Sequence, residues 1–144
     1  MAHEKDMTSK KLEDYTDVFA DILNVLLFHK NLLKPELLKS GPTESIYKTD
    51  VQTLNDQRRD TLKDYMDESR FLIASIGIEN QSKIHYAMPL RHMLGDAFSY
   101  LKEYNEIAKK HKKEKDYTAT DEFLSRMKKT DRLHSVLTIC IYYG

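Results

Sequence analysis

The segment that most constrains the fold is an apolar run of eight residues at positions 71–78, which includes three isoleucines. Its length and β-branched content are typical of a buried strand. The run leads directly to Glu79, Asn80 and Gln81, so an acidic residue stands at the strand end. Because residues two apart in a strand face the same side, we expect Glu79, Gln81 and Lys83 to share one face. Asn80 is expected on the other face.

The remaining elements follow from apolar spacing and from the prolines. Helical spacing over 11–29 predicts one amphipathic helix, and Pro35 suits the first turn of a short helix over 31–38. The later elements are expected in this order: a short strand over 44–49, a segment over 58–65 that is either helix or strand, a turn over 67–70, a helix from Met88 to about Ile107, a charged helix end or loop over 109–115, and a strand over 135–143.

This order predicts an α/β fold in which helices pack on a small sheet. A length of 144 residues suits a single domain, and we expect residues 1–10 to be flexible. The chain ends directly after its last predicted strand, at Tyr142-Tyr143-Gly144. From this ending we expect the chain to be the front portion of a longer pattern that is truncated after the strand.

Composition excludes several classes of protein. Basic and acidic residues both number 23, so no global field attracts nucleic acid or an anionic membrane, and such binding needs a local patch. The single cysteine, Cys140, cannot form an internal disulfide, and its apolar neighbours predict a buried hydrophobe. No basic leader or long apolar run suggests secretion or membrane insertion. A cytoplasmic location without a membrane partner is expected.

Two acidic residues, Asp60 and Glu79, are the strongest candidates for chemistry. If 58–65 is an antiparallel neighbour of 71–78, joined by the turn at 67–70, Asp60 can lie beside Glu79. Neighbouring carboxylates repel each other, and a divalent cation such as Mg²⁺ or Mn²⁺ relieves that repulsion. Such a site would activate water for phosphodiester hydrolysis.

A simpler interpretation competes with the metal site. In it, Asp60 is exposed on a helix, and Glu79 is a strand-end carboxylate in a salt bridge with Lys83 or Arg91. Spacing alone favours this interpretation, because one Asp and a Glu-x-Gln form a weak pattern.

The stretch Ile76-Gly77-Ile78-Glu79-Asn80-Gln81, followed by Tyr86-Ala87-Met88-Pro89, adds a second kind of argument. With 19–24 upstream and 135–143 downstream, it resembles the Rpn/transposase-like group of the PD-(D/E)XK nuclease superfamily, from about Tyr15 to Gly144. The resemblance implies a restriction-endonuclease-like core of helix, three-stranded meander, helix and strand. It also implies a metal-dependent DNA endonuclease of recombination or mobile-element biology.

The resemblance also implies roles for single residues. Asp60 and Glu79 match the metal-binding acids, and Asp21 matches the acidic member of the first-helix block, although helical projection predicts a solvated Asp21. Gln81 stands where the wider superfamily has its catalytic lysine. Glutamine can orient water but supplies no charge, so Lys83 or Arg91 is the candidate for contacting the phosphate.

Basic residues are dense in one region only, and the four that we assign to DNA binding besides Arg91 are Lys109, Lys110, Lys112 and Lys113. They could follow a phosphate backbone, but acidic residues between and after them fit an ordinary solvated surface equally well.

Two other classes of function stay open. A catalytically inactive nuclease-fold module could bind DNA or a protein partner as a regulator or inhibitor, and the zero net charge and Gln81 favour it. A self-associating protein, such as a homodimer, could pair its last strand with that of a second copy.

Overall fold

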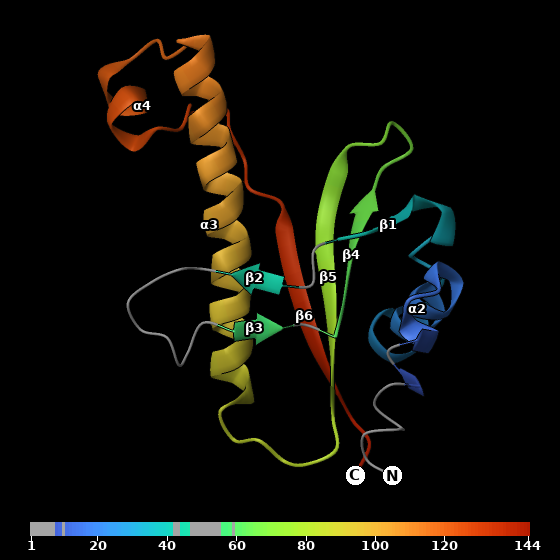
Figure 1. Cartoon of the computed structure of the whole chain (residues 1–144). Helices are drawn as coiled ribbons and strands as arrows, with labels where there is room; N and C mark the ends of the chain where they lie inside the picture. Colours follow the sequence, from blue (N-terminus) through green and yellow to red (C-terminus); the bar gives the residue numbers. More distant parts are fainter. Residues whose placement is uncertain (1–7, 10, 42–43, 47–55, 59) are drawn as a thin grey trace.

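A mixed sheet of four strands lies at the centre of the structure (Figure 1). The computed structural model describes residues 8–9, 11–41, 44–46, 56–58 and 60–144, so most of the expected flexible segment 1–10 lies outside the described residues. The strand order is β1 (Leu38–Ser40), β4 (Thr61–Met66), β5 (Leu72–Gln81) and β6 (Ser135–Tyr142). β1, β4 and β5 are antiparallel neighbours, whereas β5 and β6 are parallel. The predicted α/β architecture is therefore confirmed.

The other elements surround this sheet. They are α2 (Thr16–Leu23), the π-helix η1 (Asn24–Phe28), the 3-10 helix η2 (Pro35–Leu37), the separate antiparallel pair β2 (Glu44–Ile46) and β3 (Asp56–Arg58), and helices α3 (Met88–Glu114) and α4 (Thr120–Ser125). A parallel strand pair needs a crossover connection, and α3 supplies it between β5 and β6. Helices α2 and α3 lie on opposite sides of the strands (Figure 1).

The hydrophobic core lies between the sheet and α2. Phe19 and Leu23 of α2 pack with Ile76 and Ile78 of β5, and all four side chains are buried. Lys63 of β4 lies on the same face and is buried too. Its Nζ donates a hydrogen bond to the carbonyl oxygen of residue 14 (2.8 Å) and lies 5.5 Å from the centre of the Phe19 ring. Burial lowers the pKa of Lys63.

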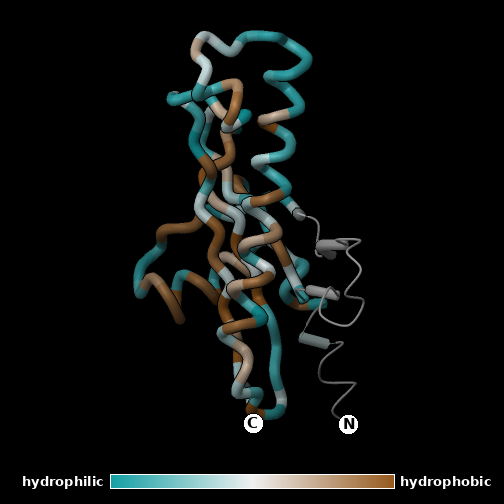
Figure 2. The backbone as a smooth tube through the Cα atoms, turned by 90° about the vertical axis from the view of Figure 1, so that its left-hand side faces the viewer, coloured by the Kyte–Doolittle hydropathy of each residue, from teal (hydrophilic) through white to brown (hydrophobic). Residues whose placement is uncertain are grey.

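The opposite face of the sheet meets α3 through polar contacts. Thr138 of β6 donates a hydrogen bond to Asp96 of α3 (2.6 Å), and Tyr100 accepts one from the backbone N–H of Val136 (3.1 Å). The C-terminal half of α3 is mainly hydrophilic (Figure 2). Because it carries so few apolar residues, we infer that this half of α3 extends past the core.

The N-terminal region differs from its predicted form. The single helix expected over 11–29 is broken: residues 11–13 are helical, a turn follows, and then come α2 and η1. The short helix expected over 31–38 is only a 3-10 turn. Buried Asn24 explains why 31–38 forms no longer helix. Its side-chain oxygen accepts hydrogen bonds from the N–H groups of Leu32 and Leu33, which hold those two residues extended.

The strand prediction also needs two corrections. The strand that pairs with β4 is β1, whereas the expected strand over 44–49 begins as β2 in the separate small sheet, and residues 47–49 lie outside the described part. The undecided segment over 58–65 is mainly β4, which joins β5 through the predicted turn. Cys140 is exposed rather than buried, because Ile139 and Ile141 occupy the core face of β6.

The charge run over 109–115 is helical almost to its end, so α3 continues about two turns beyond its predicted end at Ile107. α4 was not predicted.

Phe19→Ala should lower the free energy of unfolding by about 3–5 kcal/mol, because it removes a fully buried ring from the core. Urea denaturation followed by circular dichroism measures this change. Phe71→Ala is the matched control, since Phe71 is 72% exposed and its loss should change stability by at most about 0.5 kcal/mol. Equal effects for the two variants would contradict this description of the core.

Candidate functional site

The start of β4 and the end of β5 meet, and this brings Asp60 to the residues that follow the apolar run. Thr61 is the cross-strand partner of Ile78, so Asp60 comes next to Glu79 along the antiparallel ladder. The Oδ2 atom of Asp60 accepts a hydrogen bond from the backbone N–H of Asn80 at 2.6 Å. The predicted approach of Asp60 to the end of β5 is therefore present in the structure.

Glu79 is buried and surrounded by donors. Its Oε1 accepts a hydrogen bond from Nε2 of Gln81 (3.1 Å) and pairs with the guanidinium of Arg91 (3.0 Å). Its Oε2 lies 3.2 Å from Nε2 of His92. Gln81 thus shares a face with Glu79, as the strand alternation predicts. The α3 helix supplies the other two partners from its first turns.

The simpler interpretation of the sequence is partly right. Glu79 does form a salt bridge with Arg91, as that interpretation expects. Asp60, however, is only partly exposed and directly precedes β4 rather than lying on a helix. Lys83 lies in the exposed segment after β5.

Glu13 is a third acidic residue at this end of the sheet, and sequence reasoning missed it. It is buried, and its carboxylate accepts hydrogen bonds from Nδ2 of Asn80 (2.8 Å) and Oγ1 of Thr61 (3.1 Å). Burial raises the pKa of Glu13, and the negative charges of Asp60 and Asp14 add to this effect. The hydrogen bonds from Asn80 and Thr61 oppose it without cancelling it.

The assignment of Asp21 as a metal ligand finds no support in the geometry. Asp21 lies on the exposed face of α2, as helical projection predicted. The carboxylate from the N-terminal region that the structure places beside the strand ends is Glu13, which bonds to both Thr61 and Asn80.

Cys140 of β6 lies directly opposite Glu79 in the parallel strand pair. Partial desolvation raises the pKa of its thiol, and the negative charges of Glu79 and Asp60 raise it further, while Arg91 acts in the opposite direction. A thiol with a raised pKa is a poor nucleophile. The raised pKa argues against Cys140 as the nucleophile of this site.

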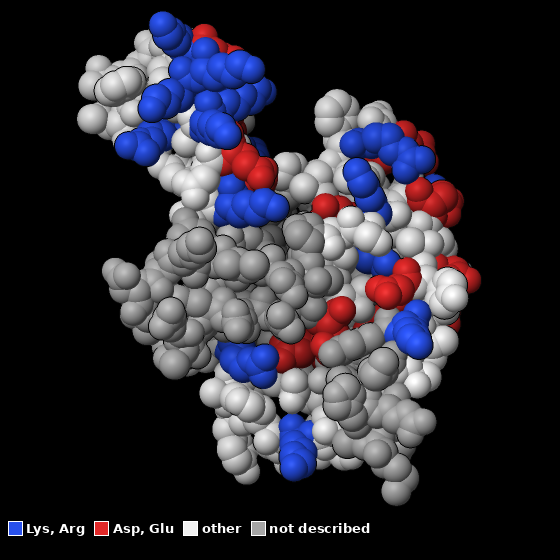
Figure 3. All heavy atoms as spheres, in the orientation of Figure 1, with Lys and Arg blue, Asp and Glu red and all other residues white. Residues whose placement is uncertain are grey.

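The basic residues Lys109, Lys110, Lys112 and Lys113 are exposed on the last turns of α3. Together with basic residues of the α4 region, they gather at one end of the molecule (Figure 3). Eighteen residues of helix separate Arg91 from Lys109, which corresponds to about 27 Å along the axis of α3. The acidic pair and this basic end are therefore separate parts of the surface.

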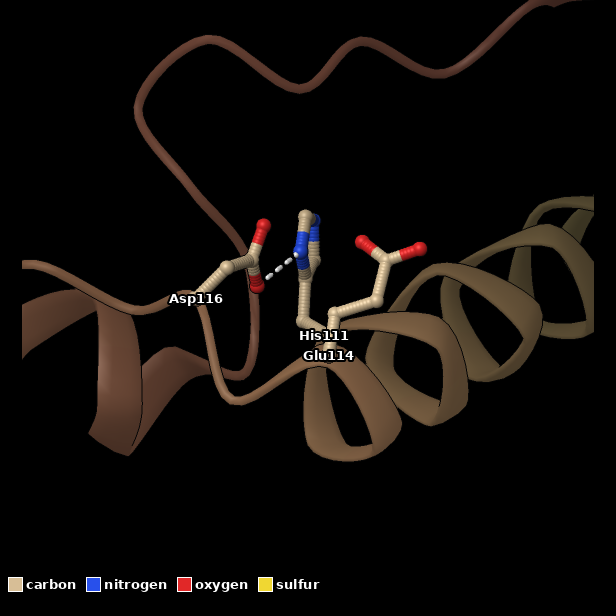
Figure 4. A group of neighbouring side chains, drawn as sticks. All are labelled: His111, Glu114 and Asp116. Carbon is tan, nitrogen blue, oxygen red and sulfur yellow. Dashed lines mark hydrogen bonds and ion pairs between the residues drawn. The ribbon is translucent and has the colours of Figure 1, made fainter.

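A second cluster of ionisable groups lies where α3 ends. The buried ring of His111 has Nδ1 2.7 Å from Oδ1 of Asp116 and Nε2 2.9 Å from Oδ2 of Asp131 (Figure 4 shows the first contact). Burial lowers the pKa of His111, but the two carboxylates outweigh it and raise the pKa overall. His111, Glu114 and Asp116 offer ligand atoms within 4.8 Å of one another and could hold a metal ion.

Comparisons of the chain with protein-family models, with curated proteins and with solved structures give no match. The fold and the site by themselves define a mixed α/β protein with acidic residues at the end of the strand pair β4 and β5. None of the helices in the described part of the chain is long and apolar enough to cross a membrane.

Glu13→Gln should stabilise the protein at pH 8 in the presence of EDTA, because burial disfavours the ionised form of Glu13. Glutamine can accept from Asn80 and donate to Thr61, so it keeps both contacts. Because the pKa of Glu13 is higher in the folded state than in the unfolded state, the stability of the wild type falls as the pH rises through that pKa. The stability difference between Glu13→Gln and wild type should therefore shrink toward zero at pH 4.

Urea titrations of both proteins at the two pH values measure this difference. Glu36→Gln, at an exposed carboxylate, is the control and should change stability by at most about 0.5 kcal/mol at either pH. A Glu13→Gln variant that is less stable than wild type at pH 8 would show that the ionised form is favoured.

Proposed function

We propose that the protein is a metal-dependent DNA endonuclease with a restriction-endonuclease-like core. The observation that carries the proposal is the hydrogen bond from the backbone N–H of Asn80 to Asp60 (2.6 Å), which brings Asp60 to the end of β5, where Glu79 lies. The sheet around them joins the antiparallel strands β1, β4 and β5 to the parallel strand β6 through α3, which is compatible with the core that the sequence resemblance implies, with the β2–β3 pair inserted between β1 and β4. The more specific assignment to the Rpn/transposase-like group, with a role in recombination or mobile elements, is supported by the sequence resemblance alone.

The donor set fits a hard divalent cation. Asp60 and Glu79 provide carboxylate oxygens, whereas buried Glu13 lies on the opposite face of the sheet, at Thr61 and Asn80, and is not part of the donor set. Carboxylate oxygens, such as those of Asp60 and Glu79, are the ligands that Mg²⁺ and Mn²⁺ prefer. When bound at Asp60 and Glu79, the ion would supply charge and a water of lowered pKa for attack on a phosphodiester.

The residues around Glu79 would then take distinct roles. Gln81 lies close enough to Glu79 to orient a water, since both side chains are on one face. Arg91 neutralises Glu79 in the structure, and its side chain is 34% exposed. A cation at Glu79 would replace Arg91 as the counter-charge, leaving the guanidinium to bind the scissile phosphate. Lys83, in the exposed segment after β5, is the second candidate for that contact.

The DNA backbone would extend from the acidic pair toward the basic end. The spacing of about 27 Å corresponds to about eight phosphates along one strand of duplex DNA. The lysines at 109, 110, 112 and 113 would then contact phosphates, which position DNA without reading its sequence.

A catalytically inactive nuclease-fold module is the second candidate function, and one observation favours it. Both carboxylate oxygens of Glu79 already have partners, in Arg91 and His92, and Gln81 has no positive charge. Such a module would bind DNA or a protein partner. β6 is at the edge of the sheet and exposes Tyr142, so pairing with β6 of a second copy is one way to form a homodimer.

The endonuclease should nick supercoiled plasmid with Mg²⁺ or Mn²⁺ and should stop when EDTA is added. Asp60→Asn and Glu79→Gln should each lower the rate by at least about 100-fold, because a lost ligand removes the ion and its activated water. Glu68→Gln changes an exposed carboxylate outside the site and should leave the rate unchanged. Wild-type protein that binds DNA but does not cut it with either metal would favour the inactive module.

Binding of duplex DNA should depend on the lysines at the end of α3. The double variant Lys109→Gln/Lys113→Gln should bind more weakly and should reduce the slope of log K against log salt by about 2, one for each lost phosphate contact. Fluorescence anisotropy at several salt concentrations measures this slope. The control is Lys30→Gln/Lys39→Gln, at exposed lysines elsewhere; an equal loss there would mean that only total charge matters.

A further inference from the structure

We propose that His111, Glu114 and Asp116 form a zinc-class metal site at the end of α3, separate from the acidic pair of the sheet. The proposal does not depend on the proposed function. It is argued from the placement of a buried imidazole between carboxylates and from the group that holds its second nitrogen.

The end of α3 brings the three ligands together. The helix ends at Glu114, and Lys115 adopts the left-handed conformation (φ 53°), with its N–H bonded to the carbonyl oxygen of His111 at 2.8 Å. This reversal returns the chain, so that Asp116 lies on one side of the imidazole and Glu114 on the other (Figure 4). Their ligand atoms lie within 4.8 Å of one another.

The imidazole is fixed in the orientation that such a site needs. His111 is only 5% exposed, and its Nδ1 lies 2.7 Å from Oδ1 of Asp116, one of the other two candidate ligands. Its other nitrogen, Nε2, meets Asp131 at 2.9 Å. Asp131 is itself held by the backbone N–H of Lys128 at 2.7 Å. Metal-bound histidines in proteins characteristically donate their second N–H to a carboxylate in this way.

The ligand types select the ion. Imidazole nitrogen and carboxylate oxygen are both ligand types that Zn²⁺ binds, and three protein ligands would leave a fourth position for a water. Mg²⁺ prefers an all-oxygen environment and would not compete well for an imidazole nitrogen. Glu114 is exposed at the helix end, so its side chain is free of packing that would prevent it from turning toward an ion.

A bound ion would tie α3 to the chain that follows it. Asp116 lies beyond the helix end, and Asp131 lies just before β6, so the site and its supporting carboxylate span the whole connection that contains α4. Without an ion, this connection is held by the His111 contacts, by the Lys128–Asp116 ion pair (3.3 Å) and by the bond from Tyr104 to the carbonyl oxygen of Ser125 (2.9 Å). The ion would add one more link between α3 and this connection.

Calorimetric titration of the full chain with Zn²⁺, after removal of any affinity tag, tests the proposal. We expect one site per chain, about 10–100-fold weaker in Asp131→Asn, which removes a supporting carboxylate, and weaker still in Glu114→Gln, which removes a ligand. Glu106→Gln, at an exposed carboxylate of the same helix, should bind as wild type does. Asp60→Asn should also bind as wild type, and this separates the zinc site from the proposed nuclease site.

Thermal unfolding with and without Zn²⁺ gives an independent readout. Ligand that binds only the folded state raises its stability by RT ln(1 + [L]/Kd), so the wild type should melt at a higher temperature with Zn²⁺ and Glu114→Gln should respond less. Far-UV circular dichroism checks that each variant folds. No saturable binding in wild type, or equal affinity in wild type, Glu114→Gln and Asp131→Asn, would overturn the site and leave His111 as part of an ion-pair cluster.

Discussion

Two carboxylates fix the end of β5, and the position of the acidic site depends on them. Asp60 accepts a hydrogen bond from the backbone of Asn80, while Glu13 accepts one from its side chain on the opposite face of the sheet. Hydrogen bonds to charged acceptors are stronger than neutral ones, so they hold the strand firmly. Because Asn80 is held from both sides, the direction in which Glu79 points is set as well. Three distant segments of the chain therefore meet at one strand end.

The charge of Glu79 links the site to the position of α3. A buried carboxylate is costly unless it is paired and hydrogen-bonded, and Glu79 obtains its partners from Arg91 and His92 in the first turns of that helix. The helix N-terminus also favours nearby negative charge. The same contacts serve both candidate functions, because a cation can replace Arg91 in an enzyme, whereas a permanent ion pair suits a binding module. The chemistry of the site thus depends on whether Arg91 can leave Glu79.

Local sequence pattern predicts the strands whose residues are mostly apolar. The run at 71–78 and the strand over 135–143 are apolar along their length, and both were predicted well. Periodicity does not identify β4, because its core face carries Thr61 and Lys63, which are buried with partners in residues 13 and 14. No periodicity in the sequence signals such partners. The missing helix over 31–38 has the same origin, since Asn24 bonds to the N–H groups of Leu32 and Leu33, eight and nine residues away.

The candidate site, like the fold, was predictable from sequence only where its residues are close together along the chain. Asp60 and Glu79 follow from strand pairing across a short turn, which is a local property. Glu13 could not be found in this way, because it reaches Asn80 across 67 residues and lies before the break in the helix. The His111 cluster was missed for another reason: its three ligand residues lie in or next to a charge run that the pattern assigns to a solvated helix end, and only the supporting Asp131 is distant, at 20 residues.

The length of α3 determines how the two proposed metal sites can influence each other. Twenty residues of helix place His111 about 30 Å from Arg91, which is several times the Debye length of about 8 Å at physiological salt. The charge of an ion at one site is therefore screened from the other. The lysines at 109, 110, 112 and 113, by contrast, lie within one turn of His111. An ion at His111 would offset the carboxylates beside them and strengthen their attraction for a phosphate backbone, so it would change DNA binding and leave the chemistry at Glu79 unaltered.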